Sequence, residues 1–191
     1  MIDFNRILQA EDVLLRPISR EDAASFKALT REEPMWTYFT SDLSLENELD
    51  EWINSALKQL EEQSRLAFSI IDKSIGKIVG STSFGNISRR DQRIEIGWTW
   101  LGQEYLGQGL NDQAKYLMIK HCFEDLDVER VEFKTDVLNA PARRALTRIG
   151  MVEEGILRSH TLMTHGRRRD TVFYSLLRAE WAAIKIRNAW G

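Results

Sequence analysis

The chain has 191 residues, of which 43% are hydrophobic and 29% are charged, as in one soluble globular domain, which we expect to span residues 1–191. Its 29 acidic residues outnumber its 26 basic ones, which argues against a nucleic-acid partner, and no apolar run approaches the ~20 residues that span a membrane. The single cysteine, Cys122, leaves no intrachain disulfide and favours a reducing, cytoplasmic compartment, and three scattered histidines without a cysteine cluster predict no metal site. The N-terminal residues mix polar and apolar side chains, unlike a signal peptide.

The first third of the chain predicts one strand and two helices. Residues 13–18 form a β-rich run, and Ser19 stands three residues before Asp22 in a capping pattern that predicts a helix over 21–30. Apolar residues then recur at helical spacing from 44 to 60, with charged residues between them. We therefore expect this second helix to be amphipathic, with one face for the core.

The next segments change from helical spacing to strand spacing. The runs 66–72 and 78–84 predict a hairpin. The strand 93–101 alternates strictly, which places its isoleucines and tryptophans on one face and Arg93, Glu95, Gly97 and Thr99 on the other. We expect a ligand to bind where this strand passes through a loop into a helix.

The remaining elements predict an α/β fold with a mixed, mostly antiparallel β-sheet flanked by helices. Asn139 is a strong helix N-cap, and Gly150 closes the same helix. The expected elements are a helix over 111–126, a strand over 131–135, the helix between these caps, a hairpin of 156–162 with 169–177, and a helix over 180–188.

A short glycine loop, Gly107-Gln108-Gly109, precedes the helix that begins near Leu110. Two glycines let a ligand approach the backbone closely, and the helix N-terminus adds partial positive charge at the same point. The loop therefore predicts a phosphate or diphosphate site, with a purely structural turn as the alternative. Leu110-Asn111 replace the Lys-Ser/Thr pair of a P-loop, and the third glycine of the dinucleotide fingerprint is missing.

Four motifs in order resemble the GNAT superfamily of acyltransferases. Residues 104–109 are similar to its acyl-CoA loop, Gln/Arg-x-x-Gly-x-Gly/Ala, from which Glu104 departs. Residues 95–98, Glu-Ile-Gly-Trp, resemble a second motif of the family, and 139–151 resemble a third. The pattern between 158 and 181 is similar to the RimJ/RimL-like branch. The resemblance runs from about residue 13 to residue 181 and implies a GNAT-like fold that uses acetyl-CoA as co-substrate, without a metal.

The resemblance also implies positions for the bound coenzyme. Pantetheine would pair with the end of the central strand near Trp100 and Leu101, where one backbone N–H would polarise the thioester oxygen. Asn139 would hydrogen-bond the pantetheine, and Arg143 would reach the nucleotide phosphates, although a solvated helix face is an equal alternative for Arg143. The diphosphate would lie on the loop residues Leu106, Gly107, Gln108, Gly109, Leu110 and Asn111.

Proton transfer is less completely specified. Glu95 is the candidate general base for the attacking amine, with a solvent-facing strand carboxylate as the alternative. Many members carry a tyrosine where this chain has Leu146, and the branch often carries a serine where it has Ala142. Neither acid for the leaving thiolate is therefore present, and water or Tyr105 is left for that role.

The resulting hypothesis is an N-acetyltransferase that moves acetyl from acetyl-CoA to a primary amine. The branch suggests protein N-terminal amines, aminoacyl-nucleotides or small amines as acceptors. The alternative is a non-catalytic CoA-binding or interaction module, motivated by Ala142 and Leu146. Members of the family are often dimeric, which leaves a homodimer open. His160 and His165 are expected either on the surface of the last hairpin or in the acceptor pocket.

Overall fold

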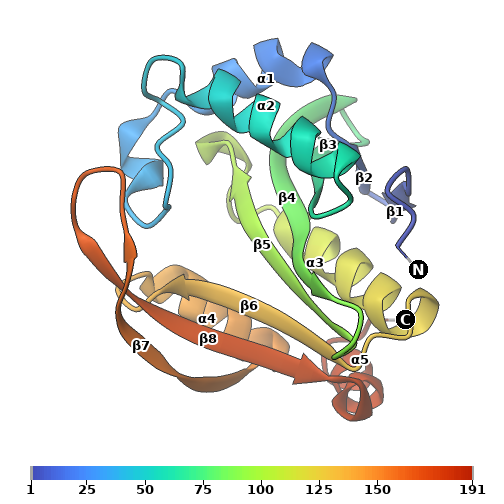
Figure 1. The fold of residues 1–191 in the computed structure, drawn as a ribbon. Coiled ribbons are helices and arrows are strands. Elements are labelled where there is room, and N and C mark those ends of the chain that lie inside the picture. The colour runs from blue at the N-terminus through green and yellow to red at the C-terminus, as the bar shows by residue number, and fades with distance from the viewer. Residues whose placement is uncertain (1, 191) are drawn as a thin grey trace.

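The computed structural model describes residues 2–190, and eight strands of this part form one sheet (Figure 1). The strand order is β1-β2-β3-β4-β5-β6-β8-β7, with all neighbouring pairs antiparallel except the parallel pair β5 and β6. The mixed, mostly antiparallel sheet predicted from the sequence is confirmed. The strands are β1 Leu8–Gln9, β2 Val13–Pro17, β3 Leu66–Asp72, β4 Lys77–Ser88, β5 Arg93–Leu101, β6 Arg130–Asp136, β7 Val152–Leu162 and β8 Arg168–Leu177.

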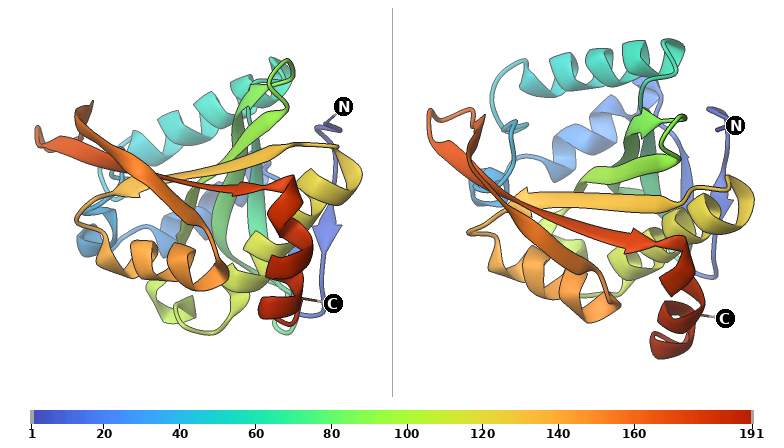
Figure 2. Two further views of the ribbon diagram at one scale, coloured as in Figure 1. Left: turned by 90° about the horizontal axis from the view of Figure 1, so that it is seen from below. Right: turned by 60° about the horizontal axis from the view of Figure 1, so that its bottom comes forward.

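Helices cover both faces of this sheet. Figures 1 and 2 place α1 and α2 on one face and α3, α4 and α5 on the other. Within residues 2–190, no helix is long and apolar enough to cross a membrane. The helices are α1 Ala23–Leu29, α2 Glu48–Glu61, α3 Leu110–Lys120, α4 Ala140–Ile149 and α5 Trp181–Arg187, with a π-helical turn His121–Asp125 after α3 and 3-10 turns at Arg20–Asp22, Glu33–Trp36, Gln103–Tyr105 and Arg178–Glu180.

Two hydrophobic cores lie on the two faces of the sheet. The larger core packs α3, α4 and α5 against the strands, and the fully buried Met118 and Cys122 belong to it. The smaller core packs α1 and α2 against Ala67 and Trp100. Burial raises the pKa of the Cys122 thiol, because a thiolate loses its hydration there. Cys122 is therefore a core residue, as its position within a helix predicts.

A β-bulge in β5 corrects the predicted alternation of this strand. Trp98 and Thr99 together stand opposite the single residue Thr82 of β4, and Trp98 has a φ of 52°. An extra residue inverts the faces of everything that follows it. Ile94 and Ile96 accordingly face the larger core, whereas Trp100 packs in the smaller core on the other side.

The parallel strands β5 and β6 separate soon after they meet. They pair only over Arg93–Glu95 and Arg130–Glu132, at one end of β5. Figure 1 shows the two strands diverging from that point. Beyond Glu95, the backbone of β5 therefore has no strand on its β6 side within the described residues. This divergence positions the candidate site.

Two predicted boundaries move for local reasons. The second helix begins at Glu48 rather than at 44, because Asn47 takes a φ of 68° and Ser44 is held in a turn by the carboxylate of Asp42. Strand β7 begins at Val152 rather than at 156, because the chain pairs with β8 almost immediately after Gly150 ends α4.

Candidate active site

A cavity of about 380 Å³ lies where β5 and β6 diverge. Both strands line it, and so do the loop between α1 and α2, the β7–β8 hairpin and the helices α3 and α4. The cavity therefore passes through the sheet from one face to the other. Polar, charged and apolar side chains all line its walls. The principal lining residues are Tyr38, Glu95, Asn111, Lys115, Lys134, Asn139, Leu146, His160 and Arg169.

The glycine loop beside this cavity exposes a row of backbone amides. Gly107 and Gly109 have φ values of 76° and 81°, which favour glycine, and a Cβ at either position would meet open space. The N–H groups of residues 107–111 donate to no acceptor within residues 2–190. Gln108 closes the loop by donating from its side-chain amide to the carbonyl of Glu104 at 2.6 Å. Unpaired amides at the N-terminus of α3 form a cradle that suits a diphosphate.

The two leucines that flank the glycine loop differ in burial. Leu106 is 58% exposed, whereas Leu110 is buried in the larger core at the first position of α3. Asn111 is the next residue, and it contributes both an unpaired amide and part of the cavity wall. The loop and the cavity are thus continuous at Asn111.

Glu95 projects into the cavity and is not a solvent-facing carboxylate. Its exposed fraction is only 6%, and its Oε2 accepts hydrogen bonds from Asn86 and Lys134, each at 2.6 Å. The other oxygen, Oε1, lies on the side of Gly97 and accepts no hydrogen bond from the described residues. One carboxylate oxygen is therefore anchored, and the other can receive a proton from a substrate or a water molecule.

Of the predicted pantetheine-binding residues, Asn139 lines the cavity, whereas Trp100 and Leu101 do not. Asn139 lines the cavity, but its Oδ1 caps α4 by accepting from the amide of Ala142 at 3.2 Å, which leaves its Nδ2 for a ligand. Trp100 and Leu101 bury their side chains at 4% and 5% exposure. The backbone of Trp100 and Leu101 pairs with β4 on one side and lies beyond the paired part of β6 on the other.

The structure places Arg143 away from the cavity wall. Its guanidinium donates to the carbonyl of Val137 at 3.1 Å, to the hydroxyl of Tyr174 at 3.2 Å and to Glu153 at 3.1 Å. These contacts tie α4 to β7 and β8. The predicted role of Arg143 at the nucleotide phosphates stays a prediction.

The β7–β8 hairpin forms one wall of the cavity. The imidazole of His165 contacts the buried carboxylate of Asp42 at 2.8 Å, and Thr164 donates to the carbonyl of Thr40 at 3.0 Å. Figure 1 shows the hairpin reaching the loop between α1 and α2. His160 lines the cavity, whereas His165 lies on the surface of the hairpin with 65% of its side chain exposed. Each histidine thus takes one of the two expected positions, pocket or surface. The hairpin wall of the cavity lies on the sheet face of Glu95, opposite the wall formed by α3 and α4.

Lys115 is a residue that the sequence reading missed. It lies on α3 one turn after Asn111, lines the cavity, and is only 8% exposed. Burial lowers its pKa to about 8, because the ammonium loses hydration. A lysine among the inward-facing residues of a predicted helix is the signal that could have identified it.

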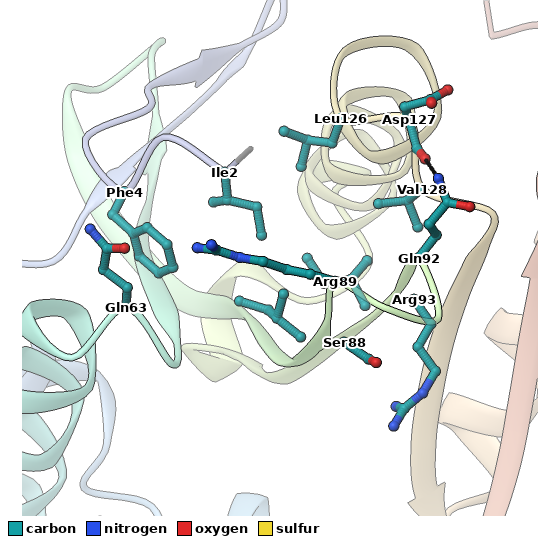
Figure 3. Close-up of a pocket in the computed structure, with 12 residues that line it drawn as sticks. Ile2, Phe4, Gln63, Ser88, Arg89, Gln92, Arg93, Leu126, Asp127 and Val128 are labelled. Atoms are coloured by element: carbon teal, nitrogen blue, oxygen red, sulfur yellow. Dashed lines mark hydrogen bonds between the residues drawn. The ribbon is translucent and has the colours of Figure 1, made fainter.

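A second cavity, of about 310 Å³, lies at the far end of β5. Figure 3 shows Arg89 extending across it toward Phe4, with Gln92 donating to the backbone carbonyl of Asp127 at 3.3 Å. The unpaired loop amides and Glu95 do not line it. The cavity between β5 and β6 is therefore the better candidate for a coenzyme site.

The fold and this cavity define an α/β protein with unpaired loop amides beside a polar cavity between two diverging strands. The acetyltransferase (GNAT) domain family matches residues 12–152. The uncharacterized N-acetyltransferase p20 of Bacillus licheniformis is 30% identical over 179 residues, which are 92% of this chain and 98% of that protein. The chain belongs to the GNAT acetyltransferase family, whose acetyl donor is acetyl-CoA.

Other N-acetyltransferases are similar to this chain in sequence or share its fold. YdaF of Bacillus subtilis (strain 168), named as an unconfirmed ribosomal N-acetyltransferase, is 36% identical over 110 residues, or 58% of this chain and 59% of YdaF. A GCN5-related N-acetyltransferase from Brucella melitensis superposes with a TM-score of 0.88 at 29% identity, covering 97% of this chain and 85% of its own. Mycobacterium smegmatis RimJ, in a complex with CoA-disulfide, shares the fold with a TM-score of 0.78 at 22% identity, over 93% and 89% of the two chains.

Proposed function

We propose that this chain transfers the acetyl group of acetyl-CoA to a primary amine by direct attack. The observation that carries the proposal is the continuity of the unpaired amides of residues 107–111 with a cavity that extends to Glu95. The coenzyme would enter along α3, and the amine would enter from the hairpin side. The two substrates would then meet between β5 and β6.

The chain's own groups suit the parts of this reaction. The loop amides hold the diphosphate, and a backbone N–H near Trp100 or Leu101 polarises the thioester carbonyl, since β5 has no strand on that side. Glu95 accepts the proton of the attacking amine through its available oxygen, directly or through water. The thioester supplies a sulfur leaving group with a pKa of about 8.5 as a thiol, which makes its departure favourable.

We propose a protein N-terminal amine as the acceptor, with aminoacyl-nucleotides and small amines as alternatives. The name of the relative YdaF, which refers to the ribosome, supports a protein acceptor. The loop 38–40 and the hairpin residues His160 and Thr161 line the cavity and would contact the acceptor. A non-catalytic CoA-binding module remains the outcome if no amine is acetylated.

Acetyl-CoA is expected to raise the melting temperature of the protein. A ligand at 100 times its dissociation constant stabilises the folded state by about 2.7 kcal/mol. Differential scanning fluorimetry with acetyl-CoA, CoA and adenosine measures this effect, and adenosine, which has no diphosphate, should give little of it. Equal melting temperatures with and without millimolar acetyl-CoA would contradict the proposed coenzyme.

A further inference from the structure

Lys115 is a buried cation that makes no ion pair with the described residues. Its side chain is 8% exposed, and its ammonium donates to no acceptor within residues 2–190. The nearest acidic influence is Asp112, one turn earlier on α3, but the carboxylate of Asp112 is bound by Arg148 of α4 at 2.7 Å. The position therefore carries a charge that the fold does not neutralise.

This arrangement costs stability. Transferring an ammonium group from water into a protein interior is unfavourable unless a counter-charge accompanies it. An apolar residue of similar length would fill the same inward-facing position of α3, between Ala114 and Leu117, without that cost. Packing therefore does not explain a lysine here, whereas chemistry in the cavity does.

Lys115 lies on the opposite wall of the cavity from the β7–β8 hairpin. It lies on the wall formed by α3 and α4, together with Asn111, Asn139 and Leu146. The Oδ1 of Asn111 is also buried there and accepts no hydrogen bond from the part of the chain that the structure describes. The coenzyme, held by the loop before α3, would pass along this wall on its way to Glu95.

Other charged groups face the cavity from each element around it. The carboxylate of Glu95 and the ammonium of Lys134 are paired with each other across β5 and β6. Tyr38 of the loop between α1 and α2 and His160 and Arg169 of the hairpin line the other side of the cavity. Asp112 of α3 and Arg148 of α4 lie beside the helical wall and pair with each other. On the wall of α3 and α4, Lys115 is the titratable residue among the described residues that line the cavity.

We propose that Lys115 is a catalytic residue whose ammonium donates a proton to the sulfur of CoA as the thioester bond breaks. This inference rests on the proposed acetyl transfer. In that reaction the amine nitrogen forms a bond to the acetyl carbon, the carbon–sulfur bond breaks, and the sulfur retains the electron pair. The amine proton passes to Glu95, and the sulfur receives a proton from Lys115. Between turnovers Glu95 releases its proton to solvent and Lys115 takes one up from solvent, so no net proton is gained or lost.

The ionisation of Lys115 suits this role. A general acid is most effective when its pKa is close to the working pH and to that of the group it protonates. Burial lowers the pKa of Lys115 to about 8, and a thiol has a pKa of about 8.5. The side chain thus supplies the acid that neither Ala142 nor Leu146 supplies from the neighbouring wall of α4.

The test compares the wild type with Lys115→Met and with Lys115→Arg. Methionine keeps the length of the side chain but has no proton to give, and arginine keeps the charge but does not release its proton near neutral pH. With a verified amine, we expect both variants to lower kcat by about a hundredfold while the KM for acetyl-CoA stays within about twofold. Wild-type kcat should fall above about pH 8 as Lys115 loses its proton, and this fall should be absent in Lys115→Met.

Two controls separate this role from a structural one. Lys120→Met removes an exposed lysine from the same helix and should leave the kinetics unchanged. Lys115→Met should melt at or above the wild-type temperature near neutral pH. Between about pH 8 and about pH 10 the folded wild type binds fewer protons than the unfolded chain, so its stability should rise relative to Lys115→Met.

The outcomes are distinct. A folded Lys115→Met variant with wild-type kcat and an unchanged pH profile would overturn the role of Lys115 while leaving acetyl transfer intact. A lower kcat that retains the alkaline fall would make Lys115 a positioning residue and would also overturn the role as an acid. Failure of the wild type to acetylate any amine would remove the proposed function and this inference with it.

Discussion

Replacing Glu95 by glutamine is expected to lower kcat at neutral pH by about a hundred- to ten-thousandfold, the usual contribution of a general base. Glutamine is nearly isosteric, and its carbonyl can still accept from Asn86 and Lys134, which now contact Oε2 at 2.6 Å. The variant loses the oxygen that faces Gly97 as a proton acceptor. The loss should shrink as the pH rises, because the amine then deprotonates without help. Steady-state kinetics from about pH 6 to about pH 9 measure both effects.

Glu132→Gln is the matched control. Glu132 is the register partner of Glu95 on β6, has a similar exposed fraction of 9%, and is also held by basic side chains, Arg93 and Arg130. It does not line the cavity between the strands. Its substitution tests the cost of losing a buried carboxylate from this sheet, and turnover should change little. A folded Glu95→Gln variant with wild-type rates across this pH range would return Glu95 to a structural role.

The second large effect is expected from Gly109→Val, which should weaken CoA binding by about 10- to 100-fold. A β-branched residue is strained at a φ of 81°, so the loop should shift. The shift would remove hydrogen bonds from the loop amides to the diphosphate, and each of these is worth about 1.5–3 kcal/mol. The fold should persist, because a Cβ at this position meets no neighbouring atom within 4 Å. Isothermal titration calorimetry with CoA measures the change.

Gly76→Val is the control for backbone strain alone. Gly76 has a φ of 64° in the turn between β3 and β4, and its Cβ position is equally open. The two variants should lose comparable stability, and only Gly109→Val should lose affinity. Equal CoA affinities in all three proteins would mean that the loop is only a turn.

Much of the fold could be predicted from local patterns. The hairpin of β3 and β4 follows from two β-rich runs, and the cap residues Asn139 and Gly150 delimit α4 as predicted. The family resemblance is confirmed by the GNAT domain match over 12–152. These features depend on local strand and helix propensities and on glycine positions, both of which can be read from a single sequence.

The bulge in β5 could not be predicted, because its sequence alternates as well as a regular strand does. Only the pairing with β4 shows that Trp98 and Thr99 share one partner. The inversion determines which side chains reach the cavity and which reach the smaller core. The strand β1, two residues long, likewise exists only through its pairing with β2.

The polar character of the candidate site depends on contacts between distant segments. Glu95 is buried because Asn86 of β4 and Lys134 of β6 converge on it, and neither neighbour is indicated by the pattern of β5 itself. Arg143 is drawn to Tyr174 and Glu153 by the same long-range pairing of β7 with β8. The roles that motifs assign to single residues therefore stay predictions. The position of the glycine loop 107–109 between a strand and a helix, in contrast, can be predicted from the local sequence.

The most direct test of the central claim is the release of free thiol from acetyl-CoA by the purified chain, measured together with the mass of the acceptor. N-terminal peptides, aminoacyl-nucleotides and small amines form the acceptor panel. We predict that one acceptor gains the mass of one acetyl group for each thiol released, and that Gly109→Val and Glu95→Gln both reduce this coupled rate. Binding of acetyl-CoA without acetylation of any acceptor would contradict the account and favour a non-catalytic CoA-binding module.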